Sequence, residues 1–292
     1  MPAICLDAAS AAFPPRLHDI PDAPIRLWVR GDPASLAGHA VAIVGSRRAS
    51  PGSLELARRL GRDLAAIGLT VVSGLARGCD AAAHRGALDA GGRTVAVLGS
   101  GIDVLYPPEH DLLASEIAQR GAVISEFSPE AAPLPFRFRQ RNRLISGLSL
   151  GVVVIEANER SGSLITAGCA LAQGREVMVV PGTVHAGRNR GGHLLIRDGA
   201  ALVENAEDVL GVLTASLPPP SSVQGAHPAE DEAPTGDPVL DALDPEDPQE
   251  FDELARRLPV APAELLTRLA DLELAGRIVR VAGGRFVRSK GK

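Results

Sequence analysis

Lysine is almost missing from this chain of 292 residues, because the only two are Lys290 and Lys292 and arginine carries the remaining positive charge. Cysteine is also scarce, and Cys5, Cys79 and Cys169 form neither a disulfide framework nor a zinc-ligand pattern. No apolar run approaches the length of a membrane span, and the first residues lack the basic and apolar regions of a signal peptide. These absences predict a cytoplasmic protein without a membrane segment.

Two nucleotide-binding motifs are missing as well. The Gly-x-x-x-x-Gly-Lys-Ser/Thr loop of P-loop nucleoside triphosphatases does not occur, which disfavours ATP hydrolysis. The segment Gly99–Val104 begins like a dinucleotide-binding fingerprint, but Val104 replaces the third glycine and the segment follows the third predicted strand instead of the first. We also find no metal-ligand set and no nucleophile elbow, so we expect no cofactor, no metal and no catalytic residues.

The net charge of −5 hides an uneven distribution. Residues 198–255 hold fifteen acidic side chains and no Lys or Arg, whereas residues 1–197 carry 21 basic and 17 acidic groups, and residues 256–292 carry nine and three. Two mildly basic parts therefore flank an acidic bridge. Basic surfaces attract polyanions, although the same balance also fits an ordinary solvated surface.

Short β-rich runs alternate with longer amphipathic stretches, which is typical of parallel strands joined by crossover helices. The predicted strands are His39–Val44, Leu69–Val72, Arg93–Leu98, Ala122–Glu126, Gly151–Glu156 and Glu176–Val180. The predicted helices are Pro51–Ile67, Asp80–Ala90, Glu109–Arg120, Gln140–Leu148 and Leu164–Gln173. We expect an α/β fold, an extended Rossmann-like, doubly wound and mostly parallel sheet, over residues 13–213.

The ends of this domain carry weaker signals. Residues 1–12 suggest a disordered N-terminal end, and an upstream segment, Phe13–Leu17 followed by Ile25–Arg30, is expected to pack against the first strand. Ala201–Val203 and Ala206–Leu213 are expected to close the domain.

The last quarter of the chain has a different composition. Residues 214–237 are rich in Pro, Ser, Ala and acid without hydrophobic periodicity, which predicts a flexible linker. Helical patterns and two basic strands follow at Val239–Leu243, Phe251–Leu258, Pro262–Ala275, Ile278–Val281 and Arg285–Arg288. Three helices and a hairpin turned by Gly283 and Gly284 predict a small winged-helix domain over residues 238–290.

Small-residue turns follow five of the predicted strands: Gly45–Arg48, Ser73–Gly78, Gly99–Gly101, Ser161–Thr166 and Pro181–Gly182. Ligands of open parallel sheets bind beyond the carboxyl ends of the strands. One such turn alone fits tight connection geometry, but five together favour a continuous anion site.

Arginine occupies every second position from Arg137 to Arg143, just before the strand that leads to Ser161–Thr166. Guanidinium groups match phosphate oxygens, and a small-residue loop that opens a helix aims free backbone N–H groups and the helix dipole at an anion. Phe136 and Phe138 interleave with these arginines in a chain with only 3% aromatic residues. These positions predict that the rings stack on bases, and we expect this of Phe138 more than of Phe136. The alternative is that one of the rings anchors the segment to the core.

Acidic side chains near the carboxyl ends of the predicted strands allow more than one interpretation. Asp80 and His84 lie four apart on one predicted helix, and we interpret them as a helix cap and surface contact near Arg77. Glu126 and Glu156 end strands and either act as general bases or orient Arg141 or Arg143. We prefer the orienting role.

Five segments together resemble the DprA/Smf family: Val44–Arg47, Ser73–Asp80 with His84, Gly99–Pro107, Arg141–Ser149 and Arg160–Ala167. The resemblance spans residues 13–213 and its motifs are highly specific. It implies a non-enzymatic protein of natural transformation that binds single-stranded DNA, protects incoming strands and loads RecA recombinase onto them. It also implies a homodimer built through the Rossmann-like domain.

The resemblance assigns a phosphate cradle to Gly45, Ser46 and Arg47 and a base contact to Phe138. The full predicted DNA-binding set is Gly45, Ser46, Arg47, Arg77, Gly99, Gly101, Phe138, Arg139, Arg141, Asn142, Arg143, Ser161, Gly162, Ser163, Leu164 and Thr166. One departure is Gly191-Gly192-His193, where the family commonly shows Gly-Thr-Asn.

Two other functional classes remain open. Related Rossmann-like proteins hydrolyse nucleoside monophosphates with a Pro-Gly-Gly-x-Gly-Thr-x-x-Glu loop, but Arg160–Ala167 occupies the comparable place without that Glu. A winged-helix regulator is disfavoured because its recognition helix, Pro262–Ala275, has three acidic residues against Arg268. We prefer the hypothesis of single-stranded DNA binding with RecA loading.

Overall fold

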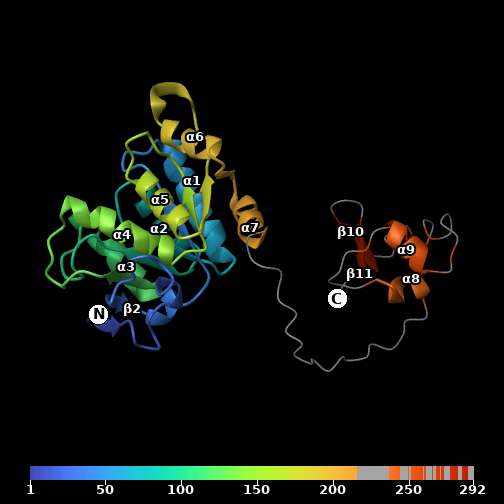
Figure 1. The fold of residues 1–292 in the computed structure, drawn as a ribbon, viewed down its shortest axis with the longest axis horizontal. Coiled ribbons are helices and arrows are strands. Elements are labelled where there is room, and N and C mark those ends of the chain that lie inside the picture. The colour runs from blue at the N-terminus through green and yellow to red at the C-terminus, as the bar shows by residue number, and fades with distance from the viewer. Residues whose placement is uncertain are drawn as a thin grey trace. The chain divides into compact units, whose positions relative to one another are not determined.

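The chain divides into two compact units, Met1–Ser221 and Ser222–Lys292 (Figure 1). The computed structural model describes residues 1–215, 237–243, 249, 251–258, 260, 265, 268–269, 271–272, 277–281 and 285–288. Most of the predicted linker, residues 216–236, therefore lies outside the described residues. Its first two residues, 214 and 215, end a helix instead, so the linker boundary was placed too early.

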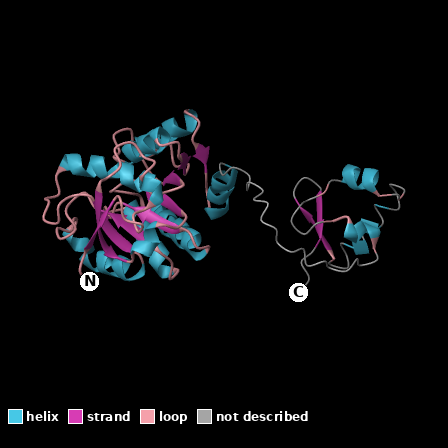
Figure 2. Cartoon of the chain, turned by 60° about the horizontal axis from the view of Figure 1, so that its bottom comes forward, coloured by secondary structure: helices cyan, strands magenta, loops and turns pink. Residues whose placement is uncertain are grey.

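One sheet of nine strands forms the centre of the first unit, in the order β1-β2-β6-β5-β4-β3-β7-β8-β9 (Figure 2). The strands are β1 Ile4–Asp7, β2 Arg26–Gly31, β3 Ala40–Val44, β4 Thr70–Ser73, β5 Thr94–Val97, β6 Ala122–Ser125, β7 Gly151–Val154, β8 Glu176–Val179 and β9 Ala201–Leu202. Strands β3 to β9 pair in parallel, while β2 pairs antiparallel with β6 and β1 with β2.

The winding of this sheet confirms the predicted fold class. The chain runs outward from β3 through β4 and β5 to β6, and it then crosses back to β7 on the other side of β3. This is a Rossmann-like, doubly wound α/β arrangement with its switch point between β3 and β7. The six predicted strands are correct to within two residues at each end.

Helices cover both faces of the sheet, which explains why its strands are continuous apolar runs. Ala42 and Val44 of β3 pack on the side of α4 (Pro135–Gly147) and α5 (Ser163–Ala172), whereas Val41 and Ile43 pack on the side of α1 (Pro51–Ala66) and α2 (Cys79–Asp89). The helices are α1 Pro51–Ala66, α2 Cys79–Asp89, α3 Asp111–Arg120, α4 Pro135–Gly147, α5 Ser163–Ala172, α6 Arg190–Arg197 and α7 Ala206–Ala215. None of the helices in the described part of the chain has the length and apolar character of a membrane span.

The predicted disorder of residues 1–12 is wrong. Strand β1 pairs with β2, with Ile4 opposite Val29 and Leu6 opposite Leu27, and Leu6 is buried in the core. A four-residue edge strand with two apolar positions is too short for its periodicity to be recognised. Residues 25–30 form β2, which pairs with β6 at the far edge of the parallel strands and not with the first predicted strand. Phe13, Leu17 and Leu27 of the upstream segment do join the core cluster that contains Ala42 of that strand.

The second unit has its own small core. It contains α8 Pro238–Asp241, α9 Phe251–Arg257 and a hairpin of β10 Ile278–Val281 and β11 Arg285–Arg288. The buried side chains include Leu240, Leu254, Leu265, Leu269, Ile278 and Phe286. Both predicted hairpin strands are confirmed. Most of the predicted helix at 262–275, and the Gly283-Gly284 turn, lie outside the described residues.

His84 is a core residue, so the predicted surface contact near Arg77 is wrong. Its side chain lies on α2 with no exposed area, and its Nδ1 is 2.6 Å from the Thr94 hydroxyl. That hydroxyl donates to the Val71 carbonyl, which leaves its lone pair to accept from Nδ1–H. Burial lowers the pKa of His84 to about 3, so the ring is neutral at physiological pH.

We expect the first unit to lose stability as the pH falls below about 6.5, the pKa of an exposed histidine. Between that pH and about 3 the unfolded chain binds a proton at this position and the folded chain does not, so each pH unit lowers the free energy of unfolding by about 1.4 kcal/mol. His84→Gln keeps a donor for Thr94 but does not titrate. In urea unfolding at pH 7 and pH 5, the wild type should lose about 2 kcal/mol more than the variant. Equal losses would contradict a buried neutral histidine.

Candidate nucleic-acid interface

Two loops meet at the edge of the sheet where the strand order reverses. One follows β3 and the other follows β7, and these strands are neighbours. Between the two loops and the start of α4 lies a pocket of about 670 Å³, which we name the switch-point pocket. Its lining includes Gly45, Ser46, Arg47, Arg48, Ala76, Asp80, Tyr106, Pro133, Pro135, Phe138, Arg139, Arg141, Asn142, Asn158, Arg160, Ser161, Gly162, Ser163, Ile165 and Thr166. The pocket sits where open parallel sheets bind ligands.

The charge around the pocket favours an anion. Five arginines line it, against the single carboxylate of Asp80. Four of these arginines are exposed and form no ion pair with an acidic side chain among the described residues: Arg47, Arg48, Arg139 and Arg160. Arg48 and Arg160 were not among the predicted site residues. Each lies directly beside a predicted residue in the sequence, Arg48 after Arg47 and Arg160 before Ser161, and this position could have identified them.

The loop after β3 is shaped by close packing on the start of α2. The Cys79 N–H donates to the Ser46 carbonyl at 3.2 Å. A Cβ on Gly45 would overlap the Cys79 side chain, and one on Gly78, whose φ is +81°, would overlap the Ser46 carbonyl. Glycine is therefore required at both positions. The loop brings the Arg47 guanidinium to 5.6 Å from the centre of the Phe138 ring.

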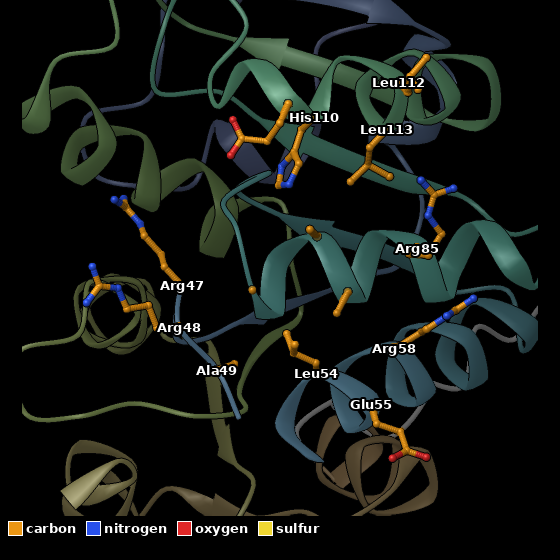
Figure 3. Close-up of a pocket in the computed structure, with 14 residues that line it drawn as sticks. Arg47, Arg48, Ala49, Leu54, Glu55, Arg58, Arg85, His110, Leu112 and Leu113 are labelled. Atoms are coloured by element: carbon orange, nitrogen blue, oxygen red, sulfur yellow. The ribbon is translucent and has the colours of Figure 1, made fainter. Parts of the chain in front are cut away.

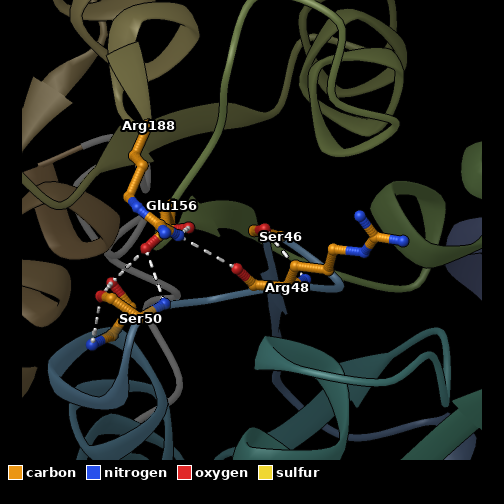
Figure 4. Close-up of polar contacts among 6 residues, drawn as sticks. Ser46, Arg48, Ser50, Glu156 and Arg188 are labelled. Carbon is orange, nitrogen blue, oxygen red and sulfur yellow. Dashed lines mark hydrogen bonds and ion pairs between the residues drawn. The ribbon is translucent and has the colours of Figure 1, made fainter. Parts of the chain in front are cut away.

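Glu156 holds the same loop from the other side (Figure 4). Its carboxylate, 3% exposed, accepts from the Ser50 N–H at 3.0 Å and from the Ser53 hydroxyl at 2.9 Å. Burial alone would raise the pKa of Glu156, but these hydrogen bonds outweigh it and lower the pKa. Arg188 lies 4.0 Å from the carboxylate and donates to the Arg48 carbonyl. Glu156 thus orients the start of α1, not Arg141 or Arg143 as the sequence suggested.

The Ser/Gly loop before α5 differs from the prediction in its hydrogen bonding. The N–H groups of Ser163, Leu164 and Ile165 bond to Ser161 and Gly162 within the loop, so these donors are not free for a phosphate. The Ser163 N–H donates to the Ser161 hydroxyl, as short serine side chains allow, and the other two donate to the backbone carbonyls of Ser161 and Gly162. The loop still presents the hydroxyls of Ser161 and Ser163, which lie 2.7 Å apart, at the N-terminus of α5.

The four alternating arginines lie on helix α4, which begins at Pro135, five residues before the predicted start. Helical geometry pairs residues four apart, so Arg137 and Arg141 share one side and Arg139 and Arg143 another. Arg143 forms a two-point ion pair with Glu126, at 3.0 and 2.5 Å. The predicted orienting role of Glu126 is therefore confirmed. Arg139 alone of the four is both exposed and in the pocket lining.

Arg141 is buried and bonded to the protein itself. Its Nη1 donates to the carbonyls of Gly74 and Val97, at the ends of β4 and β5. Burial lowers the pKa of Arg141 to about 10, so the group stays charged at neutral pH. Asp80 lies nearby and accepts from the N–H groups of Gly74 and Ala76; burial raises its pKa, against the effect of the guanidinium. Asp80 is therefore a buried backbone anchor and not a surface contact.

Phe138 is half-buried in the pocket wall. Its ring lies 5.5 Å from that of Tyr106, with the planes tilted by 54°, and the Arg141 guanidinium is 6.0 Å away. A Cβ on Gly99 would overlap the ring, so this glycine makes room for the aromatic side chain. Tyr106 was missed by the sequence reasoning, although it lies within a segment that carries the family resemblance.

Several predicted site residues lie outside the pocket lining. Arg77 is exposed and pairs with Glu109. Gly101 packs on the backbone of Ser128 and Pro129. The others outside the lining are Gly99, Arg143 and Leu164. The segment Gly191-Gly192-His193, which departs from the family pattern, bonds to the protein itself. The N–H groups of its two glycines donate to the Ala157 carbonyl, and the His193 ring bonds to the Gly182 carbonyl.

A second hollow, of about 770 Å³, adjoins the pocket at Arg47 and Arg48. It lies over α2, between α1 and the start of α3, and Figure 3 shows Leu54 and Arg58 on one side and His110 and Leu113 on the other. Two of its arginines are neutralised, since Arg58 pairs with Asp89 and Arg85 with Glu116. The described residues contain no group of His, Cys, Asp and Glu able to hold a metal ion.

Two family models match the chain. One, described as DNA recombination-mediator protein A, matches residues 5–214, and the other, the DprA winged helix domain, matches residues 223–284. Protein Smf of Escherichia coli is 41% identical over 283 residues, which are 96% of this chain and 76% of that protein. DNA processing protein DprA of Streptococcus pneumoniae is 44% identical over 198 residues, 68% of this chain and 70% of that protein.

Solved structures agree. The X-ray structure of DNA processing protein A from Streptococcus pneumoniae has a TM-score of 0.69 at 42% identity, covering 71% of this chain and 73% of that one. A Helicobacter pylori DNA processing protein A structure, concerned with its single-stranded DNA binding mode, has a TM-score of 0.66 at 29% identity, covering 73% and 96%. The family models match residues of both units and the structural matches cover 71% and 73% of the chain, so the chain belongs to the DprA/Smf family of DNA recombination-mediator proteins.

Proposed function

We propose that the chain binds single-stranded DNA in the switch-point pocket, protects the strand and loads RecA recombinase onto it during natural transformation. The observation that carries this proposal is the gathering of five arginines and the half-buried Phe138 ring around one pocket at the switch point. The single-stranded DNA binding mode described for the Helicobacter pylori relative supports it.

The pocket offers both kinds of contact that a single strand needs. The serine hydroxyls before α5 supply neutral donors, and four exposed arginines supply guanidinium donors for phosphates: Arg47, Arg48, Arg139 and Arg160. A base can reach the Phe138 ring only when it is unpaired and unstacked, which favours a single strand over a duplex. Neither kind of contact reads the base sequence, so we expect binding to tolerate any sequence.

We propose binding without catalysis. Among the described residues, Asp80 is the one carboxylate in the pocket lining, and it is committed to two backbone N–H groups. Glu126 and Glu156 are held by Arg143 and by the start of α1. A general base must reach the proton that it removes, and these three carboxylates are engaged elsewhere. This disfavours the phosphoribohydrolase alternative.

The family resemblance supports the remaining parts of the proposal. These are a homodimer built through the first unit, a handover to RecA in the cytoplasm, and a winged-helix domain that modulates binding or contacts protein. The proposed domain boundaries are residues 4–215 and 238–290, because β1 extends the first domain at its start and α7 extends it at its end.

Direct binding measurements test the function. We expect the full chain to bind oligothymidylate more tightly than a duplex of equal length. If Arg47, Arg48, Arg139 and Arg160 each contact one phosphate, the logarithm of affinity should fall with the logarithm of salt concentration with a slope of about −3. Fluorescence anisotropy across a salt series measures both quantities, and a parallel assay should find no base released from nucleoside monophosphates. Equal affinity for the duplex, or no salt dependence, would contradict the proposal.

Arg47→Ala should weaken binding to all base sequences alike, by roughly tenfold, and make the salt slope shallower by about 0.7, because a lost phosphate contact removes no base readout. The matched control is Arg62→Ala, which removes an exposed α1 arginine that pairs with Asp63 outside the pocket. A loss that depends on base sequence, or an equal loss in the control, would show that Arg47 does not hold a phosphate.

Arg139→Ala and Arg141→Ala should separate binding from folding. Removing Arg141 leaves a buried carboxylate and two carbonyls without their guanidinium partner, so the free energy of unfolding should fall by about 3–5 kcal/mol. Arg139 is exposed, and its removal should weaken DNA binding while the melting temperature stays unchanged. Thermal unfolding and anisotropy on both variants measure this. The assignment fails if Arg141→Ala is as stable as Arg139→Ala.

A further inference from the structure

Three side chains form a surface cluster just outside the switch-point pocket. The Arg137 guanidinium lies 5.4 Å from the centre of the Phe127 ring and 5.5 Å from that of Phe136, and it donates to the Ala132 carbonyl at 2.5 Å. Phe136 is 57% exposed, in a chain with only six phenylalanines. We name Phe127, Phe136 and Arg137 the aromatic–arginine platform.

The strand order places this platform beside the pocket, because Phe127 follows the strand that neighbours the pocket-lining strands in the sheet. Loops that follow β7, β3, β4 and β5 contribute to the pocket lining. The next strand in the sheet is β6, which ends at Ser125, and Phe127 comes two residues later. Phe136 and Phe138 lie about 200° apart around the first turn of α4. The first turn of α4 therefore separates Phe136, in the platform, from Phe138, in the pocket lining.

The charge of the platform is available to a ligand. Among the described residues, Arg137 forms no ion pair and bonds only to a backbone carbonyl. By contrast, Arg143 on the same helix is neutralised by Glu126, and two arginines of the hollow over α2, Arg58 and Arg85, are paired with carboxylates. The platform therefore combines an exposed aromatic face with an uncompensated cation, whereas none of the described residues that line the hollow over α2 is Phe, Tyr or Trp.

We infer that the platform stacks a nucleobase of the same single strand, beyond the part held in the switch-point pocket, with Arg137 facing the adjoining phosphate. This inference rests on the proposed function. Aromatic rings and guanidinium planes both stack on unpaired bases, and each stacked base contributes about 1–3 kcal/mol without regard to sequence. Two rings and a hydrogen bond already hold Arg137 in place, so little side-chain entropy is lost on binding.

A tryptophan at position 136 reports on stacking directly. The native chain has one tryptophan, Trp28, so the wild-type protein serves as the fluorescence blank for Phe136→Trp. Oligothymidylates of increasing length are titrated into both full-length proteins. The introduced tryptophan should be quenched by long oligonucleotides and not by the shortest ones that bind, because these fill the pocket alone.

Affinity variants provide a second measurement. Phe136→Leu and Phe136→Ala should weaken binding of long oligonucleotides by about five- to 150-fold and leave the shortest ones unaffected, whereas Phe136→Tyr should behave like the wild type. Leu112→Ala, at a 77% exposed apolar position on α3, is the control and should change nothing. If the wild type binds but Phe136→Leu is unchanged at every length and the introduced tryptophan is not quenched, the inference fails. If the wild type binds no single strand, the proposed function fails first.

Discussion

The buried guanidinium of Arg141 is the contact on which the binding edge depends. It ties helix α4 to the carbonyls of Gly74 and Val97, at the ends of two parallel strands. Asp80 engages the N–H groups of the same β4 turn, so α4, β4 and α2 are joined through one small polar cluster. Burying a charge away from water costs free energy of folding unless the charge is paired and hydrogen-bonded. Because that condition is met here, the first turn of α4 is held with Phe138 facing the pocket.

The arginines of helix α4 therefore have different roles. Arg141 supports the fold, Arg143 is neutralised by Glu126, and Arg139 faces the pocket. A spacing of two in the sequence suggested one row of phosphate contacts, but successive members of that row point about 200° apart on a helix. The helix itself was recognised only from residue 140, because charged residues obscure the apolar pattern of its first turn. Roles within a basic run thus follow from burial, which the run alone does not reveal.

The parts that the sequence predicted well are those with a strong local signal. Strands such as β3 and β7 are buried on both faces and read as unbroken apolar runs, so their bounds and the doubly wound order were recoverable. The loops at the switch point followed from glycine and serine at strand ends. Strand β1, the tie between Glu156 and Ser50, and the internally bonded N–H groups before α5 depend on partners distant in sequence or on side-chain rotation. No periodic pattern encodes them.

The central claim is that a single strand lies in the switch-point pocket against Phe138. Photo-cross-linking with an oligothymidylate that carries 5-iodouracil, followed by mass spectrometry of the cross-linked peptides, tests it most directly, because the excited base couples to aromatic side chains that it touches. The account predicts that the main cross-linked peptide contains Phe138, and that Arg47→Ala reduces its yield. Cross-links confined to the second unit, with none at α4 in a protein that binds the strand fully, would contradict it.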